Sequence, residues 1–409
     1  MREIHGVTRT IATGDVAAAD ASPFYHPTTF EISSGWVHGR VPAPAEPSRP
    51  ASSARAALDL RVLHSLLQPP CYVAFSGGRD SSAVLAIATQ QARQHGLPDP
   101  VPVTEVYPDV PEADESEWQQ LVIDHLQLTE WHRIVLTTEN DLLSEVARAS
   151  LGRRGLIWPA SLHLKDVFLG SLGGGSLLTG EGGDEVLGRR RGAQVSRLWR
   201  PVRRPTVSGL RSAAATIAPA SVRASRLPRW LEAQDIVPWL RPEARARHHR
   251  LMADDLASEP MTTAASLRWL LTRRSAVVMA RNHAAVAREH GVEITDPLLS
   301  PDFVYALARE AGTWGFASRS SAMRYLFADV LPEAVISRRS KAYFNRAFLG
   351  ADAQDFAVGW NGSGVDHDLV DSERLRAEWL SDFPSAISMM LLHSAWLGSS
   401  THTGSQEAR

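Results

Sequence analysis

The chain has 409 residues, 44% of them hydrophobic, and carries a formal net charge of −2. This length accommodates two or three domains with a sizeable core, and the composition excludes wholesale disorder. The near-neutral charge argues against a protein that coats nucleic acid. The sequence contains no run of about 18 apolar residues that would predict a membrane-spanning helix. Because the N-terminus also lacks the pattern of a signal peptide, we expect a cytoplasmic protein that does not associate with membranes.

Residues 1–55 are rich in Ala, Pro, Ser and Thr and are expected to form an N-terminal arm. Within this arm, short strands are expected at Thr28–Ile32 and Gly35–Val37, and the prolines of 42–50 predict a linker. A helical pattern of apolar residues then occupies Ala51–Leu67.

The next part of the chain alternates predicted strands with predicted helices. The expected strands are Cys71–Phe75, Pro102–Tyr107, Trp131–Leu136 and Ser176–Thr179, and the expected helices between them are Ser81–His95, Glu115–Leu126 and Asp141–Ser150. Such alternation is typical of a parallel sheet covered by helices on both faces. Residues 56–185 are therefore predicted to form an α/β core that binds a nucleotide.

An arginine-rich insert is expected at residues 186–260. Between Val186 and Leu231 there are eleven arginines and no acidic residue. Two interpretations remain open, a solvated surface and a docking surface for an acidic partner or peptide. Nucleic acid is less favoured as a partner, because aromatic residues are sparse between the arginines.

The remainder of the chain, residues 261–400, is predicted to be mostly helical, with a short tail at 401–409. The expected helices are Ala264–Glu289, Pro301–Ala311, Ser320–Val330 and Ala386–Leu397.

The first candidate site is the segment Ser76-Gly77-Gly78-Arg79-Asp80-Ser81-Ser82, between a predicted strand and a predicted helix. Two glycines let backbone N–H groups approach an anion closely, and a helix N-terminus adds partial positive charge. Serine hydroxyls supply further donors. Since Asp80 carries the wrong charge for a phosphate, its expected role is to hold Mg²⁺, which bridges phosphate oxygens. The segment is similar to the signature loop of the N-type ATP pyrophosphatases.

The second candidate site is Thr179-Gly180-Glu181-Gly182-Gly183-Asp184-Glu185, which again follows a predicted strand. Its three carboxylates repel one another unless a metal, hydrogen bonds or cations offset the repulsion. Asp80 and Asp184 each come just after a strand of one parallel sheet. They are therefore expected to face one another across magnesium pyrophosphate, at the edge where such sheets place ligands.

Together, the two segments resemble the synthetase domain of the asparagine synthetase family, whose relatives include β-lactam synthetases, carbapenam synthetases and lasso-peptide cyclases. The resemblance covers roughly residues 55–350 and implies an adenine nucleotide α-hydrolase-like fold, with ATP and Mg²⁺ as ligands. It implies metal ligation by Asp80 and Asp184 and a catalytic or substrate-orienting carboxylate at Glu181. It also implies ATP contacts from Ser76, Gly77, Gly78, Asp80, Ser81, Ser82, Tyr107, Gly182 and Asp184. For Tyr107, which lies where the family binds adenine, a half-buried strand aromatic is an equally open interpretation.

Only two of the 43 basic residues are lysines, Lys165 and Lys341. The segment Leu331–Phe344 resembles the late segment of the family, in which a lysine reaches back to the active site, and Lys341 matches that position. Its ammonium group suits the negative charge that develops during phosphoryl transfer, so a catalytic role is expected. Lys165 has no such match and is expected on a helix surface.

The sequence also departs from the family. Classical members begin with a glutaminase domain and a nucleophilic cysteine, whereas Arg2 follows Met1 here, and the only cysteine, Cys71, is expected to be buried in a strand. We therefore expect the nitrogen donor to be ammonia, a partner subunit or an amine of the substrate. Where the family tends to have Arg, Phe and Asp, this chain has Thr295, Leu298 and Ser300, which argues against aspartate as the substrate.

The function expected from the sequence is ATP-dependent, AMP-forming amide synthesis on a small-molecule or peptide carboxylate, of the lasso cyclase or lactam synthetase kind. Two alternatives remain, an ammonia-dependent asparagine synthetase and a non-catalytic scaffold subunit.

Overall fold

A parallel five-stranded sheet lies at the centre of the computed structural model, which describes residues 22–192, 217–340 and 348–406. The strand order is β3-β2-β1-β4-β5, and each neighbouring pair is parallel. The strands are β1 (Cys71–Ala74), β2 (Val101–Val106), β3 (His132–Val135), β4 (Gly175–Leu178) and β5 (Val292–Thr295). The first four confirm predicted strands, whereas β5 was not predicted.

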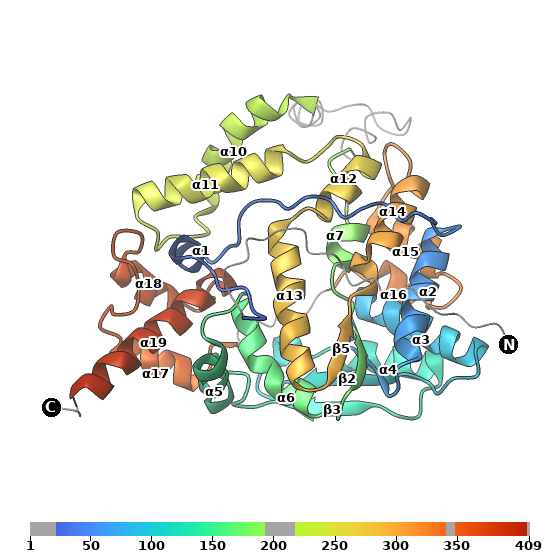
Figure 1. Cartoon of the computed structure of the whole chain (residues 1–409), viewed down its shortest axis with the longest axis horizontal. Helices are drawn as coiled ribbons and strands as arrows, with labels where there is room; N and C mark the ends of the chain where they lie inside the picture. The colour runs from blue at the N-terminus through green and yellow to red at the C-terminus, as the bar shows by residue number, and fades with distance from the viewer. Residues whose placement is uncertain (1–21, 193–216, 341–347, 407–409) are drawn as a thin grey trace.

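Helices cover both faces of this sheet, which confirms the predicted α/β fold (Figure 1). Side chains alternate along a strand, so Val73 of β1 packs into one apolar cluster and its neighbour Tyr72 into another. The first cluster contains α2 (Ala54–Leu66), α3 (Arg79–Gln94), α4 (Ser116–Leu126), α14 (Pro301–Glu310) and α15 (Arg319–Phe327). The second contains α6 (Lys165–Gly170) and α13 (Arg274–Glu289).

A third apolar cluster supports the helical part of the chain, which was predicted to follow the insert. In this cluster the rings of Trp360 and Trp379 pack with their centroids 4.8 Å apart, and Trp239 is fully buried. Each large side chain buried in this way stabilises the fold by roughly 1.5–3 kcal/mol. The helices that contribute are α1 (Thr29–Ser34), α5 (Glu145–Arg154), α11 (Pro242–Ala257), α13, α17 (Ala351–Gly359), α18 (Ser372–Trp379) and α19 (Met389–Gln406).

The strands expected at Thr28–Ile32 and Gly35–Val37 are wrong, because residues 29–34 form helix α1 and residues 35–37 form a turn and an irregular segment. Thr28 accepts a hydrogen bond from the backbone N–H of Glu31, and the Glu31 carboxylate accepts one from the backbone N–H of Thr28. This reciprocal cap stabilises a helix start and overrides the strand preference of the β-branched residues. Gly35 then ends the helix with a φ of +64°.

The single helix expected over Ala264–Glu289 is also wrong, since the chain forms α12 (Thr263–Leu270) and α13 with a break between them. At this break, residues 39–41 of the N-terminal arm lie beside residues 272–274. The carbonyl of Thr272 accepts from the N–H of Val41 at 2.9 Å, and the N–H of Arg274 donates to Gly39 at 3.2 Å. These bonds replace helical ones, a tertiary effect that helical periodicity does not reveal.

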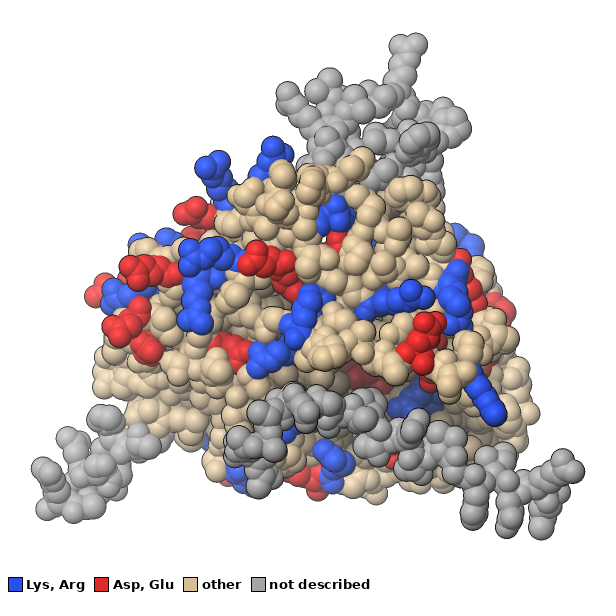
Figure 2. All heavy atoms as spheres, turned by 45° about the horizontal axis from the view of Figure 1, so that its top comes forward, with Lys and Arg blue, Asp and Glu red and all other residues tan. Residues whose placement is uncertain are grey.

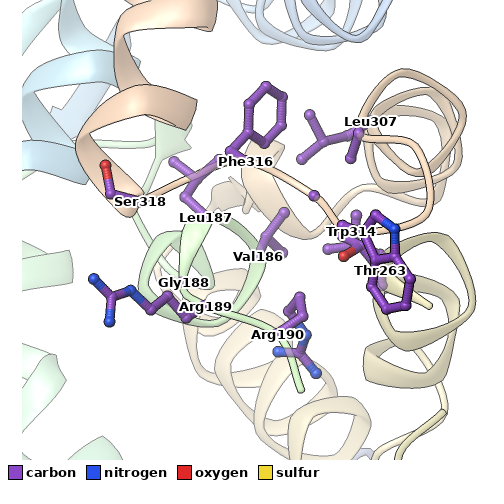
Figure 3. A pocket seen from close by; sticks show the side chains of 13 residues that line it. Val186, Leu187, Gly188, Arg189, Arg190, Thr263, Leu307, Trp314, Phe316 and Ser318 are labelled. Atoms are coloured by element: carbon purple, nitrogen blue, oxygen red, sulfur yellow. The ribbon is translucent and has the colours of Figure 1, made fainter. Parts of the chain in front are cut away.

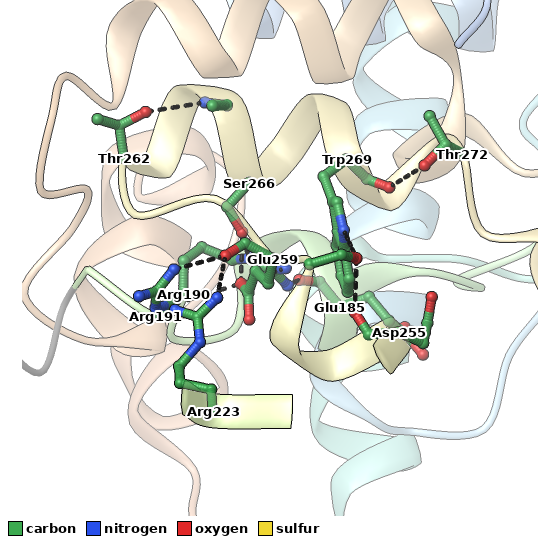
Figure 4. Close-up of polar contacts among 12 residues, drawn as sticks. Glu185, Arg190, Arg191, Arg223, Asp255, Glu259, Thr262, Ser266, Trp269 and Thr272 are labelled. Atoms are coloured by element: carbon green, nitrogen blue, oxygen red, sulfur yellow. Dashed lines mark hydrogen bonds and ion pairs between the residues drawn. The ribbon is translucent and has the colours of Figure 1, made fainter. Parts of the chain in front are cut away.

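The start and the end of the arginine-rich insert are held together by its own arginines (Figure 4). The described part of the insert includes α10 (Ala220–Gln234) and α11. The guanidinium group of Arg190 lies 2.7 Å from Glu259 Oε1 and donates to Ser266 Oγ, while Arg191 donates to the backbone carbonyl of Glu259 at 2.7 Å. Arg223 reaches the same carbonyl at 3.4 Å. These three arginines therefore have internal partners, and a docking role for the others stays a prediction.

The strand order places the two candidate segments side by side. The order reverses direction between β1 and β4, and ligands of parallel sheets bind beyond the carboxyl ends of the strands at such a point. The first segment follows β1 and the second follows β4. Among the described residues, no helix has both the length and the apolar character that crossing a membrane requires.

Candidate functional site

The loop after β1 turns backbone N–H groups away from the body of the protein. The carbonyl of Ser76 accepts from Gln119 Nε2 at 3.2 Å, and the carbonyl of Gly77 accepts from Arg338 Nη1 at 2.9 Å. Because the N–H of a trans peptide points opposite to its carbonyl, the N–H groups of Gly77 and Gly78 face away from these anchors, and that of Gly78 donates to the hydroxyl of Ser76 at 3.3 Å. Gly77 has a φ of +81°, which favours glycine. The loop is therefore shaped as a cradle for an anion.

Helix α3 begins directly after this loop and adds the positive end of its dipole. The hydroxyl of Ser81 donates to the carbonyl of Gly78 at 3.1 Å and lies 3.1 Å from the hydroxyl of Ser76. Ser82 is fully buried, and its hydroxyl has no hydrogen-bond partner within the described residues. Ser76 and Ser81 thus help to shape the loop, and contacts of the three serines with phosphate stay predictions.

A buried ion pair supports the loop from behind. The guanidinium group of Arg338 pairs with Glu115, and their side chains are only 4% and 7% exposed. The same guanidinium holds the carbonyl of Gly77, as described above, and lies 4.6 Å from the ring of Trp118. The late segment of the family resemblance thus reaches the loop through Arg338. Its predicted catalytic residue, Lys341, lies outside the described residues.

The loop after β4 lies directly against the first loop, and glycines make this possible. A Cβ added to Gly180 would lie 2.6 Å from the backbone nitrogen of Ser81, and one added to Gly183 would lie 2.2 Å from Asp80 Cγ. Gly182 has a φ of +83° and caps the start of α7 (Gly183–Leu187). Side chains in place of Gly180 and Gly183 would push the two loops apart.

Asp80 and Asp184, which were predicted to face each other, converge on one cation. Arg319, the first residue of α15, places Nη2 at 2.5 Å from Asp80 Oδ2 and pairs through Nη1 with Asp184 Oδ1. The other carboxylate oxygen of Asp80 is buried and has no hydrogen-bond partner within the described ranges. Burial raises the pKa of Asp80, although the charge of Arg319 opposes this effect.

This pair of carboxylates fits a magnesium ion. Mg²⁺ in nucleotide sites is typically held by one or two carboxylates together with phosphate oxygens and water. Here two carboxylates already face a common cation, and one buried oxygen of Asp80 is available as a further ligand. In the described part of the chain, no cluster of three or more His, Cys, Asp or Glu residues could hold a metal by itself. The arrangement therefore suits a metal that arrives with phosphate groups.

Glu181 lies in the turn between β4 and α7 with a pKa near neutrality. Burial of the carboxyl group, together with the charges of Asp296 and Glu185, raises its pKa to about 7, although the charge of Lys165 opposes this rise. Its side chain nevertheless remains accessible to solvent. The turn is fixed by a hydrogen bond from the Glu181 N–H to Thr179 Oγ1 at 3.2 Å. A reachable carboxyl group that titrates near pH 7 is suited to accept a proton.

A second charged group lies at the end of β2 and the start of α6. Lys165 Nζ lies 2.9 and 3.1 Å from the two carboxylate oxygens of Glu105, and the hydroxyl of Tyr107 donates to Glu105 at 2.8 Å. Burial and the charge of Lys165 lower the pKa of His283 to about 4, so that His283 is neutral at pH 7. Lys165 is thus half-buried in an ion pair rather than on a helix surface. Tyr107 is half-buried, and its adenine contact stays a prediction.

The residues that depart from the family pattern have structural roles. Thr295 ends β5, and its carbonyl accepts from the N–H of Thr179 at 3.0 Å. Leu298 is fully buried, and Ser300 caps α14. Cys71 is buried in β1 as predicted, and burial raises the pKa of its thiol to about 11.

The family model named asparagine synthase matches residues 60–392, which include both loops and every element that contacts them. The chain belongs to the asparagine synthase family. ATP-dependent carbon–nitrogen ligation is therefore established at the level of the family, as the sequence resemblance predicted. Among curated proteins, none matches the chain.

Three residues of this asparagine synthase site were not found by sequence reasoning. Arg319 joins the predicted metal ligands, Asp296 accepts a hydrogen bond from the hydroxyl of Thr179, and Glu105 pairs with Lys165. Asp296 directly follows β5, and Glu105 lies in β2, so their position at the carboxyl edge of the sheet was the available signal. Nothing local in the sequence points to Arg319.

Proposed function

We propose that this member of the asparagine synthase family is an AMP-forming amide synthetase. It would activate a substrate carboxylate as an acyl-adenylate and transfer the acyl group to a nitrogen nucleophile. The observation that carries this proposal is the convergence of Asp80 and Asp184, from two touching loops, on one cation beside Glu181. A site built to hold magnesium pyrophosphate next to a carboxyl base has the parts for both half-reactions.

In the first half-reaction, an oxygen of the substrate carboxylate attacks the α-phosphorus of ATP. The bond from this phosphorus to the oxygen that bridges to the β-phosphorus breaks, and pyrophosphate leaves. The loop around Gly77 and Gly78 would hold the leaving phosphates through backbone N–H groups, and the dipole of α3 would favour their negative charge. Asp80 and Asp184 would hold Mg²⁺, whose charge offsets that of the phosphates. Lys341 is proposed to add a further cation.

In the second half-reaction, the lone pair of the nitrogen nucleophile attacks the acyl carbon. The bond from this carbon to the oxygen that bridges to phosphorus breaks, and AMP leaves with its electron pair. The nitrogen must lose a proton to become an amide. Glu181 is proposed to accept this proton, since its pKa of about 7 lets it be largely deprotonated just above neutral pH and still bind a proton well. Lys165 stabilises the charged form of Glu181.

The substrate is proposed to be a peptide or specialised metabolite rather than aspartate. The nitrogen would come from ammonia, a partner subunit or the substrate itself, because the buried thiol of Cys71 is unsuited to release ammonia from glutamine. We also propose a cytoplasmic location without membrane or nucleic-acid partners. On the face drawn in Figure 2, acidic side chains are interspersed with basic ones, an arrangement that does not favour a polyanionic nucleic acid.

The proposal is tested by measuring pyrophosphate and AMP formation from Mg·ATP with candidate acids, each with and without ammonia. A pool of peptides and amino acids is expected to support turnover, and the Asp184→Asn variant is expected to lower it by at least about 100-fold, equivalent to about 2.7 kcal/mol. Asp99→Asn provides a matched control in an exposed ion pair with Arg93. Turnover with aspartate and ammonia alone would identify an asparagine synthetase. No turnover with any acid would favour a scaffold, and unchanged turnover in Asp184→Asn would refute the metal assignment.

A further inference from the structure

A cavity of about 640 Å³ lies next to the start of α15 and has no role in the chemistry proposed above. Its walls carry four arginines, Arg189, Arg319, Arg324 and Arg339, with serine hydroxyls between them. The arginines come from three places, the turn after α7, helix α15 and the segment after α16 (Glu333–Ser337). Because Arg319 also pairs with Asp80 and Asp184, the cavity adjoins the phosphate end of the site.

The cavity has more positive than negative charge. Arg324 is paired with Glu333, and Arg319 shares the two aspartates. Arg189 and Arg339 are both exposed and have no hydrogen bond or ion pair within the described ranges. In addition, the Nε of Arg319 is buried without a hydrogen-bond partner there. These unused N–H donors are suited to bind an anion with several oxygens.

The start of α15 adds backbone donors to the same cavity. This helix has nine residues, and the N–H groups of its first residues, Arg319 and Ser320, have no partner within the helix. The positive end of the helix dipole therefore acts on the cavity together with the guanidinium groups. Figure 3 shows Arg189 leaving the turn after α7 on the side of Ser318, away from Trp314. Arg189 and the start of α15 thus face the same space.

We propose that this arginine cavity is a second anion site, which receives inorganic pyrophosphate after the pyrophosphate leaves the loop around Gly77. This inference rests on the proposed function. Pyrophosphate is the polyanion that the first half-reaction releases beside Asp80 and Asp184. Arginine forks bind its two phosphate groups better than one isolated phosphate, since each group engages separate donors. Removing pyrophosphate from the acyl-adenylate prevents the reverse attack that would regenerate ATP.

The test compares the full chain with the double variant Arg189→Gln and Arg339→Gln. Binding of inorganic pyrophosphate with Mg²⁺ is measured by calorimetry in the absence of ATP, and orthophosphate is titrated in parallel. In turnover, AMP formation gives the inhibition constant of added pyrophosphate and the KM for Mg·ATP. In the double variant, pyrophosphate binding is expected to weaken by at least about 10-fold. The ratio of the inhibition constant of pyrophosphate to the KM for Mg·ATP is expected to rise by the same factor. Thermal unfolding verifies that the variant is folded.

Arg374→Gln, on α18 and 60% exposed, is the control and is expected to leave both values unchanged. Unchanged pyrophosphate binding in the double variant would overturn the inference. A rise in the KM for Mg·ATP as large as the rise in the inhibition constant of pyrophosphate would also overturn the inference, because the arginines would then belong to the ATP site. Binding of orthophosphate as tight as that of pyrophosphate would exclude a site specific for pyrophosphate. Since binding is measured without turnover, a chain that binds pyrophosphate through these arginines but forms no AMP refutes only the proposed function.

Discussion

Replacing Gly180 with alanine would separate the two loops of the site without removing any of its chemical groups. The added Cβ would lie 2.6 Å from the backbone nitrogen of Ser81 and 2.9 Å from its Cα. Both atoms belong to the backbone at the start of α3, so neither can move aside as a flexible side chain could. The backbone of Gly180 has no positive φ, so the substitution tests the contact alone.

The size of the effect follows from this contact. An ordinary contact needs about 3.4 Å, so the loops must move apart by about 0.8 Å at this point. Displacement of reacting groups by ~1 Å costs on the order of 100-fold in rate, and overpacking costs about 1–3 kcal/mol in stability. We therefore expect turnover of Gly180→Ala to fall by about 10- to 100-fold while the protein remains folded. Pyrophosphate release and urea denaturation measure the two effects separately.

Gly152→Ala is the matched control, because Gly152 lies inside α5 and, apart from the backbone of its own helix, no atom lies within 4 Å of the added Cβ. It is expected to keep full turnover and to stabilise the chain by about 0.5–1 kcal/mol, as alanine does within a helix. The reasoning would be refuted if Gly180→Ala kept the turnover of the unmodified chain. Loss of turnover in both variants would show that the assay responds to substitution in general.

Three further predictions concern charged residues. With Glu181 as the base, kcat/KM is expected to rise with pH up to about 7 and then to level off, because only the deprotonated form accepts a proton. Glu181→Gln should abolish this rise. Lys165→Met should shift the rise to higher pH, and an unshifted profile would contradict the effect of Lys165 on the pKa of Glu181. Arg338→Met is expected to destabilise the chain by about 3–5 kcal/mol in urea denaturation, because it leaves the carboxylate of Glu115 buried and unpaired, whereas adding Glu115→Leu should restore much of this loss. Arg319→Met is expected to lower the melting temperature when Mg²⁺ is absent, and added Mg²⁺ should restore the melting temperature. A melting temperature that Mg²⁺ does not restore would argue against a metal between the two aspartates.

The parts of the site that the sequence predicted are those that local chemistry specifies. Gly77 and Gly183 are needed where a backbone bends or a neighbour approaches closely, and such glycines are visible in a single sequence. Four strands were predicted from short runs of apolar and β-branched residues, and two of these runs, β1 and β4, end at the glycine-rich loops. The strand β5 was missed because its residues Glu293 and Thr295 interrupt the apolar pattern, although it lies at the edge of the sheet beside β4. Helix α1 had a local signal, the spacing of Thr28 and Glu31, which competed with a strand-like composition.

The residues that sequence reasoning missed depend on contacts between distant segments. Arg319 lies 239 positions after Asp80, and its neighbours in the sequence form an ordinary capped helix. Only the packing of α15 against α7 brings its guanidinium group to the two aspartates. Lys165 and Glu105 are separated by 60 positions, and no motif joins them. A single sequence therefore predicts the phosphate-binding loops well and the charges that surround them poorly.

The choice of substrate is expected to depend on residues outside the two glycine-rich loops. The groups that hold phosphate belong to two glycine-rich loops, which the family match covers and whose geometry leaves little freedom. The charges that act on Glu181 come instead from separate elements, with Lys165 on α6 and Asp296 after β5, and Glu105 on β2 pairs with Lys165. Asp296 anchors the loop after β4 through Thr179, whereas Glu105 and Lys165 contact each other and can be changed without removing an anchor of either loop. Substitutions at Glu105 and Lys165 should therefore alter which acid or amine is used, while the release of pyrophosphate continues to depend on Asp80 and Asp184.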